Sequence, residues 1–240
     1  MCGRYVITWQ PDEISERFQL RRLPEGMFQT YMNFNAAPTQ ELPVIVVDES
    51  GERVLRPMRW GLRARWSKPG DTKAPAPFNA RAESVLEKPM FRNLVKSKRC
   101  LVPARGYFEW QNRGDHKQPF LIGLPGDPLI AFAGLYDEFV PQGEEEPVAS
   151  YTILTTDATE FAGQFHTRMP VILEPEDEAD WVDPANTDVM GVLPMAHGYE
   201  GEMEAYPVSR AVNNVRNNDP SLLEPIEDPD GEEAEQADLF

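Results

Sequence analysis

The chain has 240 residues, of which 41% are hydrophobic and 10% aromatic, so it can bury a core and is not an intrinsically disordered protein. No apolar run is long enough to span a membrane and no segment resembles a signal peptide, so we expect no membrane partner and a cytoplasmic location. The two cysteines, Cys2 and Cys100, do not make a disulfide framework and indicate a reducing compartment. Three histidines without a Cys-x-x-Cys pattern predict no metal site, and no cofactor-binding motif is present.

The net charge of −17 argues against a nucleic-acid partner, but the distribution of charge along the chain reverses that conclusion. Residues 51–117 contain 16 Lys and Arg against 6 Asp and Glu, a local balance of +10, whereas the rest of the chain is strongly acidic. A basic central segment in an acidic chain predicts an anion-binding face of the kind that nucleic-acid-binding proteins carry.

The predicted elements are mostly short strands separated by hairpin-length connections, with a few short helices between them. In chain order we expect a helix over 11–20, strands at 43–47 and 53–60 joined by a turn at 48–51, a short helix from 89, strands at 100–102, 107–111, 120–122, 129–135 and 150–155, a helix over 157–164 and a strand at 171–173. This order predicts an α+β fold with a mostly antiparallel sheet or barrel-like core and short peripheral helices.

The C-terminal segment differs in composition from everything before it. Residues 219–240 contain nine acidic residues and no basic one, which predicts a disordered tail after a single domain over residues 2–218.

Cys2 is the residue with the most distinctive chemistry. Removal of Met1 would leave a free α-amine and a thiol on adjacent carbons, because cysteine is small enough for methionine aminopeptidase to act before it. An amine of this kind is partly neutral at pH 7 and condenses with an aldehyde to an imine, on which the thiol closes to give a thiazolidine. The alternative is that an early cysteine is incidental.

Two further segments place one reactive group beside rigid or aromatic neighbours. In 78–83, Asn79 and Arg81 could bind a sugar and a phosphate, or they are a turn residue and a surface charge. In 106–110, Glu109 stands in an aromatic strand, where its carboxylate is either desolvated and suited to acid/base work or lies on the wet face of the strand.

A histidine and two tryptophans complete the candidate residues. His166 is followed two residues later by Arg168, and the histidine is either a proton-transfer group or structural. Trp60 and Trp66 lie among nearby arginines, which is the composition of a single-strand binding site, in which aromatic rings stack on bases and cations bind phosphates. The alternative is core tryptophans beside a solvated charge run.

Taken together, the order and spacing of these motifs resemble the SOS-response-associated peptidase (SRAP) family of abasic-site-processing proteins, from residue 2 to about 226. The matching residues are Cys2-Gly3-Arg4, Asn35-Ala36-Ala37-Pro38, Trp60-Gly61 with Trp66, Asn79-Ala80-Arg81 with Glu83, Pro103 with Gly106-Tyr107-Phe108-Glu109-Trp110, His166 with Arg168-Met169-Pro170, and Pro207-Val208-Ser209 with Val212-Asn213. One difference is Ala64, where members often have proline.

The resemblance implies a sensor and shield of abasic sites in single-stranded DNA. It implies that Cys2, freed of Met1 by the protein itself, crosslinks to the aldehyde of the ring-opened sugar. By the same resemblance, Glu109 is the acid/base, Asn79 holds the sugar or the N-terminus, and His166 transfers a proton or contacts a phosphate. The resemblance also implies that backbone phosphates are bound by Arg4, Arg81 and Arg168. It implies that the DNA strand is shaped by, or stacks on, Trp60 and Trp66. The resemblance implies no cofactor, and we expect a nucleoid-associated monomer.

Two other classes of protein remain as alternatives. Glutamine amidotransferases also begin Met-Cys-Gly, but they use an Asn-Gly oxyanion hole and this chain contains no Asn-Gly dipeptide. The other alternative is a non-catalytic single-strand-binding module.

The last five residues, Gln236-Ala237-Asp238-Leu239-Phe240, resemble the Gln-x-x-Leu-Phe peptide that bacterial replication and repair proteins insert into the DNA sliding clamp. In that mode Leu239 and Phe240 fill an apolar pocket and Gln236 hydrogen-bonds at its edge. The sliding clamp is therefore a second expected partner.

Overall fold

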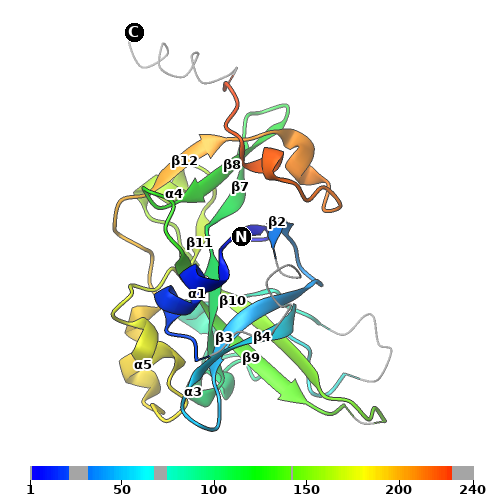
Figure 1. Cartoon of the computed structure of the whole chain (residues 1–240), viewed down its shortest axis with the longest axis vertical. Coiled ribbons are helices and arrows are strands. Elements are labelled where there is room, and N and C mark those ends of the chain that lie inside the picture. The colour runs from blue at the N-terminus through cyan, green and yellow to red at the C-terminus, as the bar shows by residue number, and fades with distance from the viewer. Residues whose placement is uncertain (1, 22–31, 68–74, 142, 229–240) are drawn as a thin grey trace.

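The computed structural model describes residues 2–21, 32–67, 75–141 and 143–228, which form two β-sheets with short helices around them (Figure 1). The strands are β1 (Tyr5–Ile7), β2 (Asn33–Ala36), β3 (Glu41–Val47), β4 (Arg53–Trp60), β5 (Asn79–Arg81), β6 (Arg99–Ala104), β7 (Gly106–Asn112), β8 (Lys117–Gly123), β9 (Ile130–Phe139), β10 (Val148–Asp157), β11 (Arg168–Pro170) and β12 (Glu204–Pro207). The helices are α1 (Pro11–Phe18), α3 (Leu94–Ser97), α4 (Glu160–Gly163), α5 (Glu178–Val182) and α6 (Val189–Val192), with 3-10 turns η1 (Ala82–Ser84), η2 (Leu193–Met195), η3 (Arg210–Asn213) and η4 (Pro220–Leu223). The predicted α+β class with short peripheral helices is confirmed.

Five strands of the larger sheet close into a barrel. The pairings run from β10 to β4, β3, β6 and β9, and β9 pairs with β10 again. β5 and β11 are attached to β10, which is parallel to β4 and β5 and antiparallel to β9 and β11. Closure leaves the barrel strands without free edges, and their fully buried side chains include Trp60, Phe132 and Tyr151.

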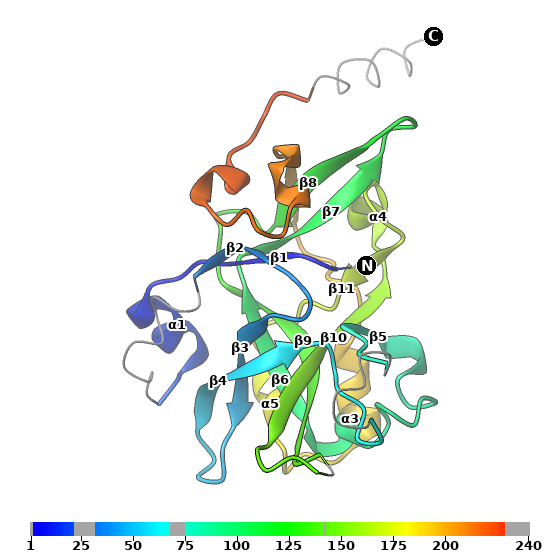
Figure 2. The same cartoon turned by 90° about the vertical axis from the view of Figure 1, so that its right-hand side faces the viewer.

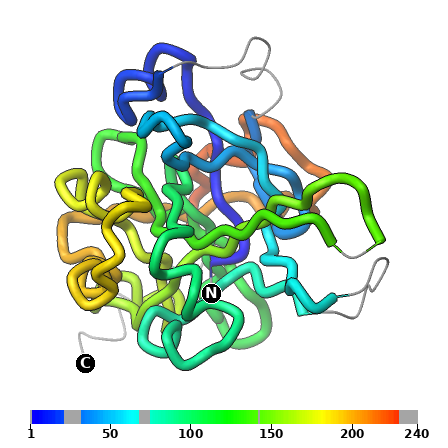
Figure 3. The backbone as a smooth tube through the Cα atoms, turned by 90° about the horizontal axis from the view of Figure 1, so that it is seen from below, coloured from blue at the N-terminus to red at the C-terminus, as the bar shows by residue number. Residues whose placement is uncertain are grey.

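The second sheet has the order β12-β8-β7-β1-β2 and lies over one end of the barrel (Figure 2). Successive side chains of a strand point to opposite faces, so this sheet contributes to two apolar clusters. Tyr5, Ile7 and Tyr107 pack into the main core with the barrel, whereas Val6 and Phe108 pack into a smaller cluster on the other face. The N-terminal segment with β1 therefore runs through the middle of the molecule (Figure 3).

Local sequence explains where α1 begins and ends and why the chain turns between β3 and β4. α1 starts at Pro11 with a capping box between Gln10 and Glu13, and it ends where Gln19 adopts a left-handed conformation. The turn between β3 and β4 is held by Asp48, whose carboxylate accepts hydrogen bonds from the backbone of Ser50 and Glu52.

The predicted elements and the observed ones differ mainly in short segments. The helix expected from 89 begins only at Leu94, the helix expected over 157–164 is confined to Glu160–Gly163, and the strand expected at 171–173 is found at Arg168–Pro170. β1, β2, β5 and β12 have three or four residues each, too few for a recognisable alternation, and they were not predicted.

The domain extends beyond the predicted boundary at residue 218. Asp219 caps η4, Leu222 is buried in the smaller cluster, and Asp228 forms an ion pair of 2.6 Å with Arg113. The expectation of disorder from 219 is therefore wrong for residues 219–228, because buried Leu222 and the pair with Arg113 hold this stretch on the second sheet. The predicted clamp-binding residues Gln236, Leu239 and Phe240 lie outside the described residues. Within the described ranges, no helix is long and apolar enough to cross a membrane.

Candidate active site and nucleic-acid interface

Cys2 lies just before β1, between the barrel and the second sheet. Its side chain is fully buried, and its Sγ lies 3.9 Å from the carbonyl oxygen of Arg4. Burial raises the pKa of the Cys2 thiol well above its ordinary value, and the nearby Glu109 carboxylate raises it further. The thiol is therefore protonated at neutral pH, and a reaction at sulfur must move that proton.

Asn79 joins the barrel side to the N-terminal segment. It begins β5, which is held parallel to β10 by pairing with Ile153, and its Nδ2 donates a hydrogen bond of 2.8 Å to the carbonyl oxygen of Cys2. Its Oδ1 is buried and has no hydrogen-bond partner among the described residues. A buried acceptor of this kind costs free energy unless a ligand or a newly formed donor satisfies it. Asn79 is therefore more than a turn residue.

Glu109 reaches the site from β7 and is only 4% exposed, so the wet-face interpretation of this residue is wrong. The pairing of β7 with β1 places Tyr107 opposite Tyr5, and Glu109 follows on the same face. Burial raises the pKa of the Tyr107 hydroxyl, and the charges of Cys2 and Glu109 raise it further. The Glu109 carboxylate is therefore close enough to Cys2 and to Tyr107 to raise the pKa of both groups.

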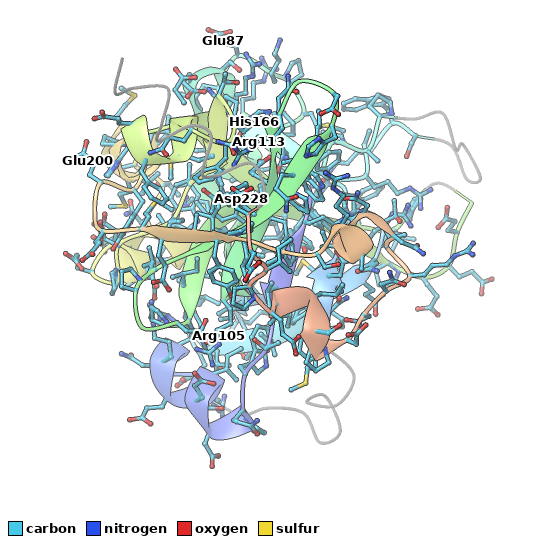
Figure 4. The ribbon with its side chains drawn as sticks, turned by 90° about the horizontal axis from the view of Figure 1, so that it is seen from above. Glu87, Arg105, Arg113, His166, Glu200 and Asp228 are labelled. Atoms are coloured by element: carbon cyan, nitrogen blue, oxygen red, sulfur yellow. The ribbon has the colours of Figure 1, made fainter. Side chains whose placement is uncertain are left out.

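His166 stands in the loop between α4 and β11. The backbone amide of Arg168 donates a 2.9 Å hydrogen bond to its Nδ1, and the same Nδ1 lies 3.2 Å from the carbonyl oxygen of Arg168. The preceding Phe165 packs against Phe120 of β8 with ring centroids 4.9 Å apart, and Phe120 is the cross-strand partner of Glu109. Figure 4 shows His166 at the same end of the β7–β8 hairpin as Arg113.

Arg168 is placed differently from the sequence prediction. It is 7% exposed, and its guanidinium binds Glu83 through two hydrogen bonds of 3.0 and 2.8 Å and Asp157 through one of 2.5 Å. Burial is the largest single influence on Glu83 and opposes its ionisation. The hydrogen bond from Arg168, added to the hydrogen bonds from Thr156 and the backbone and to the charge of Arg168, outweighs burial and lowers the pKa of Glu83 from 4.5 to about 2. Arg168 thus holds β11 to η1 and β10, and its charge is engaged within the protein instead of facing a phosphate.

Arg4 is also engaged internally. Its Nη1 donates 2.7 Å hydrogen bonds to Asn35 Oδ1 and to the carbonyl oxygen of Val212, and its guanidinium lies 5.9 Å from the ring centroid of Trp110. Asn35, which received no role in the sequence analysis, is 1% exposed and binds the carbonyl oxygens of the 212–217 loop. Arg4 and Asn35 therefore shape this loop, and the predicted phosphate contact of Arg4 is not its main interaction.

The two predicted tryptophans separate into different roles. Trp60 is fully buried and donates a 2.8 Å hydrogen bond to the carbonyl oxygen of Phe78, so no base can stack on it. Trp66 is 64% exposed. The arginines beside it are paired with acids, Arg63 with Glu144 and Arg65 with Asp137, which removes them as free phosphate partners.

Arg81 remains available. It is exposed at the end of β5, two residues after Asn79, and its guanidinium has no hydrogen-bond or ion-pair partner among the residues that the structure describes. The structure therefore brings together Cys2, Asn79 and Glu109, attaches the loop of His166 to the β7–β8 hairpin that carries Glu109, and leaves Arg81 and Trp66 exposed.

A cysteine at position 2 that is buried between a closed barrel and a second sheet, bonded to an asparagine and beside a buried glutamate, defines a distinct class of protein. The chain belongs to the SOS response associated peptidase (SRAP) family, whose profile matches residues 1–215. The resemblance predicted from the motifs is confirmed.

Relatives and solved structures agree with this assignment. The chain is 41% identical over 229 residues to the abasic site processing protein YoqW of Bacillus subtilis (strain 168), covering 93% of this chain and 99% of YoqW. It is 34% identical over 266 residues to the abasic site processing protein HMCES of Gallus gallus, covering 95% of this chain and 78% of HMCES. A crystal structure of a Bacteroides thetaiotaomicron protein superimposes with a TM-score of 0.84 at 25% identity, covering 94% of this chain and all of that chain.

Proposed function

We propose that this protein processes abasic sites in single-stranded DNA by forming a covalent crosslink through Cys2 once Met1 has been removed. The observation that carries the proposal is the hydrogen bond from Asn79 to the Cys2 carbonyl, with the buried Glu109 carboxylate beside the thiol. The relatives named above are abasic site processing proteins, which supplies the class of substrate.

The proposed reaction starts from the aldehyde of the ring-opened sugar. The α-amine of Cys2 adds to the aldehyde carbon, and loss of water gives an imine. The thiol then adds across the C=N bond, so that an S–C bond forms and the thiol proton ends on the ring nitrogen of a thiazolidine. All atoms balance with water as the one product released, and no oxidant or metal takes part.

Proton movement is the task of the acidic and basic side chains. The Cys2 thiol has a raised pKa, so ring closure requires a group that accepts its proton and delivers it to nitrogen. Glu109 is the acid/base for this step and for opening the sugar ring. His166, whose Nδ1 is held against the backbone of Arg168, assists proton transfer or binds the adjacent phosphate.

Asn79 positions the new N-terminus. Its Nδ2 already binds the Cys2 carbonyl, and its buried Oδ1 is an acceptor suited to the amine that Met1 removal creates. The exposed Arg81 and Trp66 then form the DNA-side contacts, one to a phosphate and one by stacking.

The protein removes its own Met1, which intact-mass measurement of fresh and aged protein would detect.

The experiment is incubation with a single-stranded oligonucleotide that contains one abasic site, followed by denaturing electrophoresis. Wild-type protein should give a stable shifted band, and Cys2→Ala and a variant that retains Met1 should not. Glu109→Gln and His166→Ala should slow the appearance of this band, with general acid/base effects typically of about 10²–10⁴-fold. A shifted band of wild-type yield in Cys2→Ala would overturn the proposal.

We also propose that the C-terminal peptide binds the DNA sliding clamp. The support is the Gln-x-x-Leu-Phe pattern at 236–240 in a strongly acidic segment that begins after the anchored Asp228. Such a tether would raise the local concentration of the protein on exposed single strands. Fluorescence polarisation with the cognate clamp should show binding that deletion of 236–240 abolishes while crosslinking persists, and equal clamp binding by both forms would contradict the proposal.

A further inference from the structure

Glu109 lies on a strand of the second sheet, whereas His166 lies in a loop that leads into a strand of the barrel sheet. β7 is part of the second sheet, whereas the loop connects α4 to β11, which pairs with β10 of the barrel sheet. Because a proton relay requires its groups within hydrogen-bond reach, something must hold these two elements together.

Gln111 provides a polar connection between them. It lies two residues after Glu109 on the same face of β7, since side chains of a strand alternate. Its Nε2 donates a 3.0 Å hydrogen bond to the carbonyl oxygen of Gln164, the residue that caps α4 and precedes His166 by two positions. Gln111 thus binds the backbone of the His166 loop, not a side chain that could rotate away.

An apolar contact lies directly beside this hydrogen bond. Phe165 packs on Phe120, and Phe120 pairs with Glu109 across the hairpin. The backbone amide of His166 in turn donates a 3.2 Å hydrogen bond to the carbonyl oxygen of Ala162, which continues the turn of α4. Residues 164, 165 and 166 are therefore each restrained by a contact. The first two contact the β7–β8 hairpin, and the third hydrogen-bonds to α4.

The two polar atoms of the Gln111 amide differ in exposure, because the hydrogen bond from Nε2 is exposed to solvent and the other atom is not. Gln111 Oε1 is buried and has no hydrogen-bond partner among the described residues. Leaving a buried amide acceptor unsatisfied costs about 1–3 kcal/mol, so an apolar side chain of the same size would serve packing alone better. A glutamine at this position is explained by its Nε2 donor.

We propose that Gln111 is a positioning residue that holds the His166 loop in register with Glu109 through its bond to the Gln164 carbonyl. The inference rests on the proposed crosslinking function. In this proposal Gln111 does not contact the DNA and affects the reaction only by positioning His166. Losing the bond lets the loop shift relative to β7, and misplacement of a reacting group by about 1 Å can cost roughly 10²-fold in rate.

The chain offers a matched control, because only one of the two glutamine side chains takes part. Gln111→Leu removes the donor at nearly the same volume. Gln164→Ala removes an exposed side chain but leaves the carbonyl oxygen that accepts the bond. We expect Gln111→Leu to slow crosslinking by roughly tenfold with unchanged affinity for undamaged single strands, and Gln164→Ala to behave like wild type in both respects.

A double-mutant cycle separates positioning from general destabilisation. In a His166→Ala background, Gln111→Leu should change the crosslinking rate by less than about twofold, since the residue that it positions is gone. The pH–rate profile should move in Gln111→Leu and coincide with wild type in Gln164→Ala. The same fold loss in both backgrounds, or equal losses in Gln111→Leu and Gln164→Ala, would overturn the proposal.

One readout is independent of the DNA chemistry. Amide hydrogen exchange over residues 164–168 should be faster in Gln111→Leu than in wild type or Gln164→Ala, whether or not any variant forms an adduct. If wild-type protein forms no crosslink, the proposed function fails, and exchange still decides whether Gln111 restrains the loop. Identical exchange in all three proteins would contradict the restraint itself.

Discussion

Asn79 Nδ2 donates a 2.8 Å hydrogen bond to the carbonyl oxygen of Cys2, and this bond ties Cys2 to the barrel sheet. Asn79 is held in place by the parallel pairing of β5 with β10, so the bond transmits the rigidity of the barrel to a chain terminus, which is usually poorly ordered. In the proposed reaction, Cys2 therefore starts from a defined position.

Asn79→Ala should slow crosslinking because the Cys2 segment loses this restraint. A neutral hydrogen bond contributes about 0.5–1.5 kcal/mol, which predicts a decrease of about 2- to 10-fold in a time course of adduct formation. Asn93→Ala is the matched control, since Asn93 is exposed and its side chain makes no capping hydrogen bond at α3. Equal rates for the two variants would show that the bond does not position Cys2.

Trp66→Ala should weaken binding to single-stranded DNA without loss of stability. Stacking of a base on an aromatic ring is worth about 1–3 kcal/mol, so the dissociation constant should rise at least about fivefold. Trp60→Ala should instead lower the free energy of unfolding by about 3–5 kcal/mol, as expected for a large buried side chain. Fluorescence anisotropy and chemical denaturation measure the two effects, and the opposite pattern would contradict the assignment.

Arg81→Ala should reduce the salt dependence of DNA binding. Each phosphate contact on a single strand contributes a slope of roughly −0.7 to the plot of log affinity against log salt, and the variant should lose about one such contact. Arg21→Ala, which removes an exposed arginine beyond α1, should leave the slope unchanged. If both variants keep the wild-type slope, Arg81 does not bind a phosphate.

The pair between Glu83 and Arg168 predicts a pH-dependent contribution to stability. The pKa of Glu83 is lowered from 4.5 to about 2 in the folded protein, so the contribution is fully present above pH 4.5 and is lost as the pH falls through about 2. The difference in unfolding free energy between wild type and Glu83→Gln should therefore be constant near neutrality and shrink between pH 4.5 and 2. A difference that grows on acidification would contradict the pairing.

The sequence predicts the longer strands well because their apolar patterns and turns are local properties. The 53–60 strand and the α+β class follow from such patterns. Barrel closure does not, because it depends on β9 pairing with both β6 and β10, a long-range arrangement that periodicity along one segment cannot reveal. Segments such as β1 and β5 become strands only because their neighbours supply the hydrogen bonds.

The site residues divide in the same way. The expected reactivity of Cys2 follows from covalent chemistry, and it can be predicted from the first two residues, Met1 and Cys2. Whether an arginine is free depends on its spatial neighbours, and for Arg168 the decisive partner, Glu83, lies 85 positions earlier in the chain. The hydrogen bond of Gln111 could not be predicted from the sequence either, since its partner is a backbone carbonyl oxygen that every residue possesses.

Tandem mass spectrometry of the protein–DNA adduct tests the proposed reaction most directly. After wild-type protein reacts with an abasic single strand and the DNA is digested, the sugar remnant should be found on the peptide that begins at Cys2. It should resist borohydride, since a thiazolidine has no C=N bond to reduce. A remnant attached to a lysine, or an equally abundant adduct in Cys2→Ala, would contradict the assignment of Cys2 as the crosslinking residue.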